Sequence, residues 1–133
     1  MQILALCLSA DAVLADVVVV VSSNSPVVEL SKNQLEDIFL YKVKRFPDGR
    51  EAVPIDLAEG TVTRDEFYAR FTGKSPAQIR AHWSKIIFTG RGLPPKAVLN
   101  SSEVKELIVE NPNAIGYIEQ SEVDSRVRVL LLK

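Results

Sequence analysis

Five consecutive valines, Val17–Val21, constrain the fold of this chain more than any other segment. β-Branched side chains favour the strand conformation, and a run without polar alternation is typical of a strand that is buried on both faces. A polar segment, 22–25, and then Pro26 end the run. We therefore expect a buried strand over residues 16–22, and a half-exposed antiparallel strand fits the pattern less well.

Residues typical of helix N-termini recur after this strand. Ser31 with Gln34 and Thr63 with Glu66 have the spacing of a capping box, and Ser75 stands directly before a proline. The expected helices begin after Ser31, Thr63, Ser75 and either Ser101 or Ser102, and the expected strands cover 16–22, 52–57, 114–118 and 126–132. Strands that alternate with capped helices predict a single α/β domain, with a mostly parallel sheet flanked by helices.

Composition excludes several classes of function. The 133 residues carry a formal net charge of −1, so the chain lacks the basic field with which nucleic-acid binders neutralise phosphates. Its single cysteine, Cys7, has no partner for an internal disulfide, and a single histidine, His82, excludes a histidine-rich metal site. The sequence thus predicts no nucleic-acid partner, no metal site and no cofactor.

The first fifteen residues resemble a secretory signal peptide. An apolar run leads to Val13-Leu14-Ala15, which offers a small residue at the cut position before Asp16 and a permitted residue two positions earlier. The segment is too short to span a bilayer as a helix. No Lys or Arg precedes the run and Asp11 interrupts it, so a short N-terminal core helix is the alternative. The predicted organisation is a signal peptide over 1–15, a domain over 16–133 and a periplasmic location.

Enzymatic chemistry finds little support in the sequence. His82 lies inside an expected helix, and no serine stands in a nucleophile-elbow motif. The sequence also lacks the glycine-rich phosphate-binding motifs of nucleotide-dependent enzymes. We therefore expect a binding protein and no catalytic residues.

The segment Gly60-Thr61-Val62-Thr63-Arg64 is the first candidate binding site. It joins an expected strand to an expected helix, whose first backbone N–H groups have no partners within the helix. With the helix dipole these groups favour an anion, and two threonine hydroxyls and one guanidinium add donors. The structural alternative is that Thr63 only caps the helix and Gly60 only makes the turn.

A second polar cluster, Ser23-Asn24-Ser25, follows Ser22 at the end of the valine strand. Ligands of open parallel sheets lie beyond the carboxyl ends of the strands. Because both loops follow strands, we expect them to share one edge of the sheet. The alternative is a loop whose polar side chains only solvate its backbone.

Three segments resemble the periplasmic phosphate-binding proteins, the substrate-binding components of bacterial phosphate ABC transporters. Residues 35–46, LEDIFLYKVKRF, are similar to the family's L-x-D-I-F-x-G-K-I-x-x-W segment. Gly60–Thr63 followed by Phe67 is similar to its D-G-S-G-T loop, and residues 113–119, NAIGYIE, are similar to its G-A-I-G-Y-V-E segment. The three blocks occur in the family's order.

The resemblance implies a single lobe of a type II periplasmic-binding-protein fold, because the family has two lobes and is more than twice as long. It also implies phosphate binding for an ABC transporter, through Gly60–Arg64 and less directly through Ser23–Ser25. The sequence departs from the family at Val62 and Tyr41, which replace glycines, and near Asp56 or Leu57, where the family has an anion-binding arginine. The alternative function is therefore a ligand-free interaction or sensory module, acting through a homodimer or a membrane-protein partner.

Overall fold

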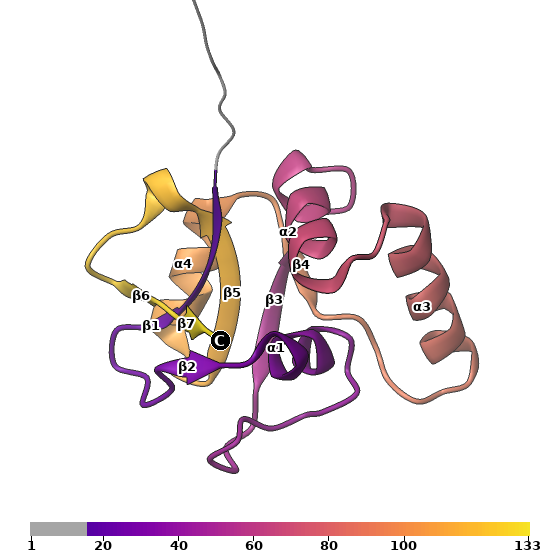
Figure 1. The fold of residues 1–133 in the computed structure, drawn as a ribbon, viewed down its shortest axis with the longest axis horizontal. Coiled ribbons are helices and arrows are strands. Elements are labelled where there is room, and N and C mark those ends of the chain that lie inside the picture. The colour runs from indigo at the N-terminus through magenta and orange to yellow at the C-terminus, as the bar shows by residue number, and fades with distance from the viewer. Residues whose placement is uncertain (1–15) are drawn as a thin grey trace, which may run out of the picture.

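The valine run forms strand β1 (Val17–Ser22), which lies inside a five-stranded sheet of the order β4-β3-β5-β1-β6 (Figure 1). The computed structural model describes residues 16–133, so the predicted signal peptide lies outside the described residues. The other strands of this sheet are β3 (Val53–Leu57), β4 (Lys96–Val98), β5 (Ala114–Glu119) and β6 (Val127–Val129). The sequence did not predict β4, whose three residues are half or fully exposed.

Strand directions confirm a mostly parallel sheet with one exception. β3 pairs in parallel with both β4 and β5, whereas β1 pairs antiparallel with both β5 and β6. Four strands therefore run one way and β1 runs the other. The expected burial of β1 is confirmed, and its antiparallel direction is the exception to the predicted mostly parallel sheet. A strand with neighbours on both edges and helices over both faces is buried in either direction.

Helices α1 (Lys32–Phe39), α2 (Val62–Thr72), α3 (Pro76–Phe88) and α4 (Ser101–Glu110) are the four expected helices. The capping boxes at Ser31 and Ser75 form as predicted. Two predicted caps are wrong: Thr61 caps α2 in place of Thr63, and Asn100 caps α4 in place of Ser101 or Ser102. Both helices therefore begin at or before the residue that was expected to cap them.

Neighbouring residues of β5 define the two covered faces of the sheet. Gly116 lies under Val104 of α4, so closely that an added Cβ would stand 2.7 Å from its Cγ1. Tyr117 faces the other way and stacks on Phe67 of α2, with ring centroids 3.9 Å apart. Because successive strand residues point to opposite faces, α4 covers one face of the sheet and α2, packed on α1, covers the other.

Short elements complete the chain. β2 (Glu29–Leu30) pairs in parallel with β7 (Leu131–Leu132), and a 3-10 turn, η2, covers Gln120–Glu122. The single strand predicted over 126–132 is thus divided into β6 and β7, because Leu130 turns its side chain into the core between them. α3 stands at the far end of the molecule from β6, joined to α2 and β4 by loops (Figure 1).

Candidate anion site at the carboxyl end of β3

Strand β3 leads through a tight turn into α2, and this turn holds the first candidate site. Gly60 has φ 95°, a left-handed conformation that glycine adopts without steric cost. Thr61 Oγ1 accepts a hydrogen bond from the Arg64 N–H at 3.3 Å and donates one to the Ala58 carbonyl at 3.0 Å. The Thr61 hydroxyl therefore fixes the turn and begins the helix.

Two backbone donors remain open at this helix start. Within residues 16–133, the N–H groups of Val62 and Thr63 have no hydrogen-bond partner. The Val62 side chain is 79% exposed, so it takes no part in the core. Free N–H groups at the positive end of a helix dipole are suited to an anion. This much of the predicted chemistry is present in the turn.

Two polar side chains of the turn are already engaged. Thr63 Oγ1 donates to Glu119 Oε2 at 3.3 Å, which joins the turn to the end of β5. Arg64 Nη1 donates to the Leu57 carbonyl at 3.0 Å and lies 3.4 Å from Asp56 Oδ2. The Nε and Nη2 atoms of Arg64 hydrogen-bond to no described residue, so its guanidinium keeps unused donors.

Asp56 is the centre of a buried polar network beside the turn. Its side chain is almost wholly buried and accepts hydrogen bonds from the hydroxyls of Tyr68, at 2.5 Å, and Tyr117. The Leu57 N–H donates to Asp56 Oδ1 at 2.9 Å. Together with Arg64, these donors surround both carboxylate oxygens.

The network sets the charge states of its members. Burial raises the pKa of Asp56 above its ordinary value, and the Arg64 guanidinium and the two tyrosine hydroxyls oppose that rise. Burial and the neighbouring carboxylate raise the pKa of Tyr68 and of Tyr117, which keeps both hydroxyls protonated as donors. Local sequence spacing does not indicate this cluster, because its members lie up to 61 positions apart.

The second predicted cluster does not share this edge of the sheet. β1 runs opposite to β3, so its last residue, Ser22, lies near the start of β5, whereas Glu119 and the α2 turn lie at the other end of the sheet. The expectation that both loops meet at one edge is therefore wrong. Because β1 runs antiparallel to its neighbours, the two loops lie at opposite ends of the sheet.

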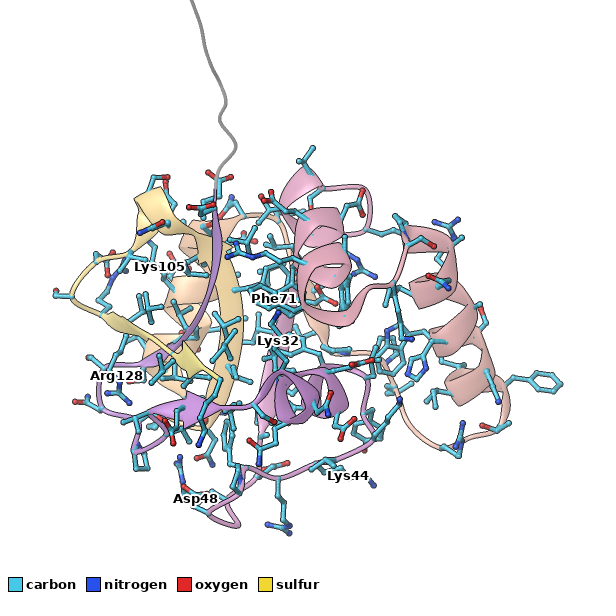
Figure 2. The ribbon with its side chains drawn as sticks, in the orientation of Figure 1. Lys32, Lys44, Asp48, Phe71, Lys105 and Arg128 are labelled. Carbon is cyan, nitrogen blue, oxygen red and sulfur yellow. The ribbon has the colours of Figure 1, made fainter. Side chains whose placement is uncertain are left out.

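Serine side chains and an arginine brace the loop after β1. Ser22 Oγ accepts from the Asn24 N–H and Ser25 Oγ accepts from the Val27 N–H, both at 3.1 Å. Arg128, which is labelled in Figure 2, donates to three carbonyls of the loop, those of Ser23, Ser25 and Val27. These contacts give the loop a structural role at a distance from the α2 turn.

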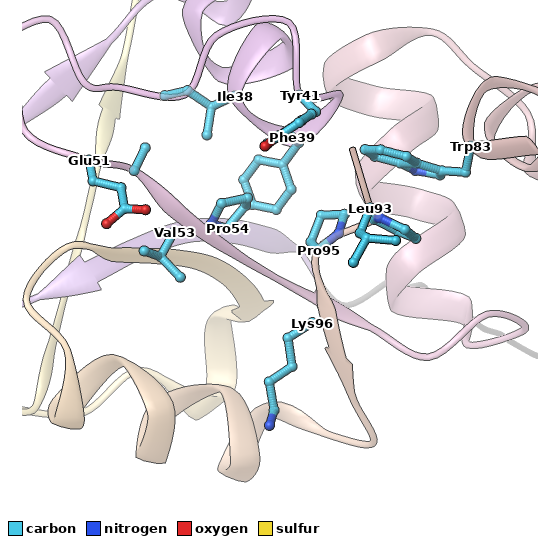
Figure 3. A pocket seen from close by; sticks show the side chains of 12 residues that line it. Ile38, Phe39, Tyr41, Glu51, Val53, Pro54, Trp83, Leu93, Pro95 and Lys96 are labelled. Atoms are coloured by element: carbon cyan, nitrogen blue, oxygen red, sulfur yellow. The ribbon is translucent and has the colours of Figure 1, made fainter. Parts of the chain in front are cut away.

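Two clefts flank Trp83 of α3. One, of about 420 Å³, is lined by Asp56, Arg64 and Arg80 together with Trp83. The other, of about 200 Å³, lies between Trp83, the end of α1 and the Pro94–Pro95 segment (Figure 3). Trp83 is 6% exposed, and its indole N–H has no hydrogen-bond partner in the described part of the chain.

Neither a metal site nor a membrane span emerges from the described residues. Within 16–133, no three His, Cys, Asp or Glu side chains come together as metal ligands would. Across the same range, no helix has the length and apolar character needed to cross a bilayer.

Comparison with known proteins identifies the fold. No protein-family model matches the chain, and no curated protein sequence matches it. Among solved structures, a phosphate ABC transporter substrate-binding protein from Clostridium perfringens with bound phosphate aligns with a TM-score of 0.68 at 25% identity, over 89% of this chain and 45% of its own. The chain is a partial structural relative of phosphate ABC transporter substrate-binding proteins. The resemblance inferred from three sequence blocks is thereby confirmed.

Two further solved structures share this fold. A phosphate transport receptor from Vibrio cholerae has a TM-score of 0.68 at 19% identity and is covered over 46% of its length. PstS from Borrelia burgdorferi has a TM-score of 0.65 at 11% identity and is covered over 47%. The chain thus spans just under half the length of these proteins.

One departure from the sequence pattern of those receptors has a visible structural consequence. Tyr41, which replaces a glycine of that pattern, is the one residue besides glycine in 16–133 with a positive φ, 63°. Its ring packs on Gly92, where an added Cβ would lie 2.2 Å from Tyr41 Cε2. A glycine in the α3–β4 loop therefore makes room for the side chain that the α1 end has gained.

Proposed function

We propose that this chain is a solute-binding domain that holds a small oxyanion at the start of α2, with phosphate as the first ligand to test. The observation that carries the proposal is the pair of unpartnered N–H groups of Val62 and Thr63, next to the free donors of Arg64. Backbone N–H groups bind oxyanions without covalent chemistry, and a guanidinium adds two-point recognition.

Neighbouring carboxylates set the conditions for binding. Arg64 compensates Asp56, but the Glu119 carboxylate accepts from Thr63 and carries no ion pair among the described residues. An incoming oxyanion competes with Glu119 for the Thr63 hydroxyl. We therefore propose modest affinity in the isolated lobe and a preference for the more protonated forms of the anion.

The biological setting follows from the same proposal. The structural neighbours named above include a phosphate-bound ABC transporter receptor, which supports delivery of the anion to such a transporter or to another membrane protein. Residues 1–15 as a signal peptide, and residues 16–133 as a periplasmic domain, remain part of the proposal.

A second function is favoured by one specific observation. Thr61, Thr63 and Arg64 all bond to groups of the chain itself, as a fold that has lost its ligand would arrange them. On this alternative the domain acts as an interaction or sensory module, through a homodimer or a membrane-protein partner.

Thermal unfolding distinguishes the two functions. The protein is refolded from denaturant to remove carried ligand and is then heated in phosphate, sulfate or chloride at matched ionic strength. A ligand at 100 times its dissociation constant stabilises the folded state by about 2.7 kcal/mol. We expect a phosphate-specific rise in Tm that Thr63→Val and Arg64→Lys reduce.

Matched controls lie at the other end of the same helix. Thr72→Val removes a hydroxyl that donates to the Tyr68 carbonyl, and Arg70→Lys alters a guanidinium that donates to the Val17 carbonyl. Both controls should keep the phosphate-dependent rise in Tm. No rise with any anion, in the wild type or in Glu119→Gln, favours the interaction module.

A further inference from the structure

The basic residues of this chain are unevenly distributed. Residues 67–102 contain no Asp or Glu but carry six Lys or Arg: Arg70, Lys74, Arg80, Lys85, Arg91 and Lys96. The rest of the chain contains ten basic and seventeen acidic residues. Although the net charge of the chain is −1, residues 67–102 form a cationic segment that includes all of α3.

Most of these cations are unpaired. Arg80 forms an exposed ion pair with Glu59 at 3.0 Å. Within residues 16–133, Lys85, Arg91 and Lys96 form no ion pair with any acidic side chain. In the described part of the chain, most cations of this segment are therefore left without a carboxylate partner.

Exposed apolar side chains lie among the unpaired cations. Phe88, the last residue of α3, is 91% exposed, and Leu93 is 73% exposed. The buried side of α3 is formed instead by Ile79, Trp83 and Ile86. We call Lys85, Ile87, Phe88, Arg91 and Leu93 the α3 tip.

Backbone N–H groups are paired from the end of α3 up to Arg91, whereas those of Gly92 and Leu93 have no partner within residues 16–133. The N–H groups of Thr89, Gly90 and Arg91 donate to carbonyls of the last turn of α3, each at 3.0 Å. The Thr89 hydroxyl donates to the Lys85 carbonyl at 2.8 Å. Paired groups enter an apolar medium at lower cost than open ones, so the end of α3 around Phe88 is better suited to entry than the loop at Gly92 and Leu93.

We propose that the α3 tip docks on a bilayer surface rich in anionic phospholipid. Apolar side chains surrounded by Lys and Arg are the features that place peripheral proteins at such a surface. The tip stands at the end of the molecule, at the far side from β6 (Figure 1). Leu93 and Ile87 each line one of the clefts beside Trp83, whereas Phe88 lines neither of them and is 91% exposed. A lipid surface deforms around such a projection, so it needs no matching cavity.

Vesicle co-sedimentation tests this proposal with the full chain. We expect the wild-type protein to bind vesicles of phosphatidylcholine with phosphatidylglycerol, to bind pure phosphatidylcholine much more weakly, and to dissociate as salt rises. Phe88→Ala should lower the partition coefficient by about tenfold, since a buried aromatic side chain accounts for that much transfer free energy. The double variant Lys85→Glu/Arg91→Glu should abolish the preference for anionic vesicles.

Matched controls separate the α3 tip from general surface properties. Val28→Ala removes another exposed apolar side chain, and Lys32→Glu reverses another exposed charge, both outside the tip. All variants carry the same residues 1–15, so a difference between them belongs to the substituted positions. The controls should bind like the wild type.

Three results would overturn the proposal. Equal binding by the wild type and both tip variants would show that the tip does not contact lipid. Equal binding to neutral and anionic vesicles would show that lipid charge does not contribute to binding. Loss of binding in the charge-reversal variant together with full binding by Phe88→Ala would indicate a purely electrostatic surface, such as one that recognises an acidic protein.

Discussion

The start of α2 and the α3 tip use similar residue types in opposite ways. At the start of α2, Arg64 lies 3.4 Å from a buried carboxylate and Thr63 bonds to Glu119. At the α3 tip, Lys85 and Arg91 have no acidic partner within 16–133, and Phe88 is almost fully exposed. In the first region the basic side chain is paired within the chain, whereas in the second the basic side chains have no acidic partner among the described residues.

This difference separates two kinds of binding. A ligand at α2 finds open N–H groups on Val62 and Thr63, but it must compete with Glu119 for the Thr63 hydroxyl and with Asp56 for Arg64. A partner at the α3 tip displaces water alone. Substitutions at α2 should therefore change the stability of the fold, and substitutions at the tip should leave it almost unchanged.

Arg64→Ala should have the largest effect on stability. It leaves the Asp56 carboxylate buried without its cation, and breaking such a pair typically costs about 3 to 5 kcal/mol. Urea unfolding measures the loss, with Arg70→Ala as a control on the same helix. A loss similar to that of Arg70→Ala would contradict the account of the buried pair.

Tyr117→Phe should follow in size. It removes a hydroxyl that donates to Asp56 and accepts from the Leu57 N–H. A hydrogen bond to a charged group contributes about 1.5 to 3 kcal/mol. Equilibrium unfolding of Tyr117→Phe beside Tyr41→Phe, whose ring is half-buried, checks the value; equal losses for both would mean that the Asp56 network contributes little.

Glu119→Gln should strengthen oxyanion binding. The substitution removes a negative charge beside Thr63 and keeps a side chain that can accept the hydroxyl. We expect about a tenfold lower dissociation constant for phosphate, which corresponds to about 1.4 kcal/mol. Calorimetric titration of wild type and Glu119→Gln measures it, and unchanged or weaker binding would place the anion elsewhere.

Asp56→Asn should change how stability depends on pH. Burial raises the pKa of Asp56 in the folded state, so its protonated form stabilises the fold. This contribution to the free energy of unfolding is fully present below the pKa that Asp56 has in the unfolded chain. It is lost as pH rises through the pKa that Asp56 has in the folded protein. The free energy of unfolding of wild type relative to Asp56→Asn should therefore fall from acidic to neutral pH; a rise would mean that Arg64 outweighs burial.

Phe88→Ala should have the smallest effect on stability. Its side chain touches little of the fold, and exposed substitutions usually change stability by less than about 0.5 kcal/mol. Urea unfolding of Phe88→Ala beside Phe67→Ala, in the stacked aromatic core, makes the comparison direct. A large loss in Phe88→Ala would show that the α3 tip packs within the chain.

Local sequence signals predicted much of the fold. Ser31 and Ser75 marked two helix starts correctly because a capping box is a contact between residues three positions apart. At α2 the same signal failed: Thr61 and Thr63 both offer a hydroxyl, and the position of Gly60 in the turn makes Thr61 the cap.

Local sequence patterns do not predict strand directions or contacts between residues that lie far apart in the sequence. The direction of β1 depends on which strands flank it, and valines do not encode that choice. The pairing of Asp56 with Tyr117 joins residues 61 positions apart, so no local spacing reveals it. The unequal distribution of Lys and Arg along 67–102 was visible in the sequence, but its meaning required the exposure of Phe88 and Leu93.

Backbone amide shifts on phosphate titration test the central claim most directly. If the oxyanion binds at the start of α2, the ¹H–¹⁵N signals of Val62 and Thr63 should move progressively and saturate with phosphate, because their N–H groups are the proposed donors. Amides of the Ser22–Ser25 loop, at the opposite end of the sheet, should stay unchanged. Saturable shifts at that loop, or none at Val62 and Thr63, would contradict the account.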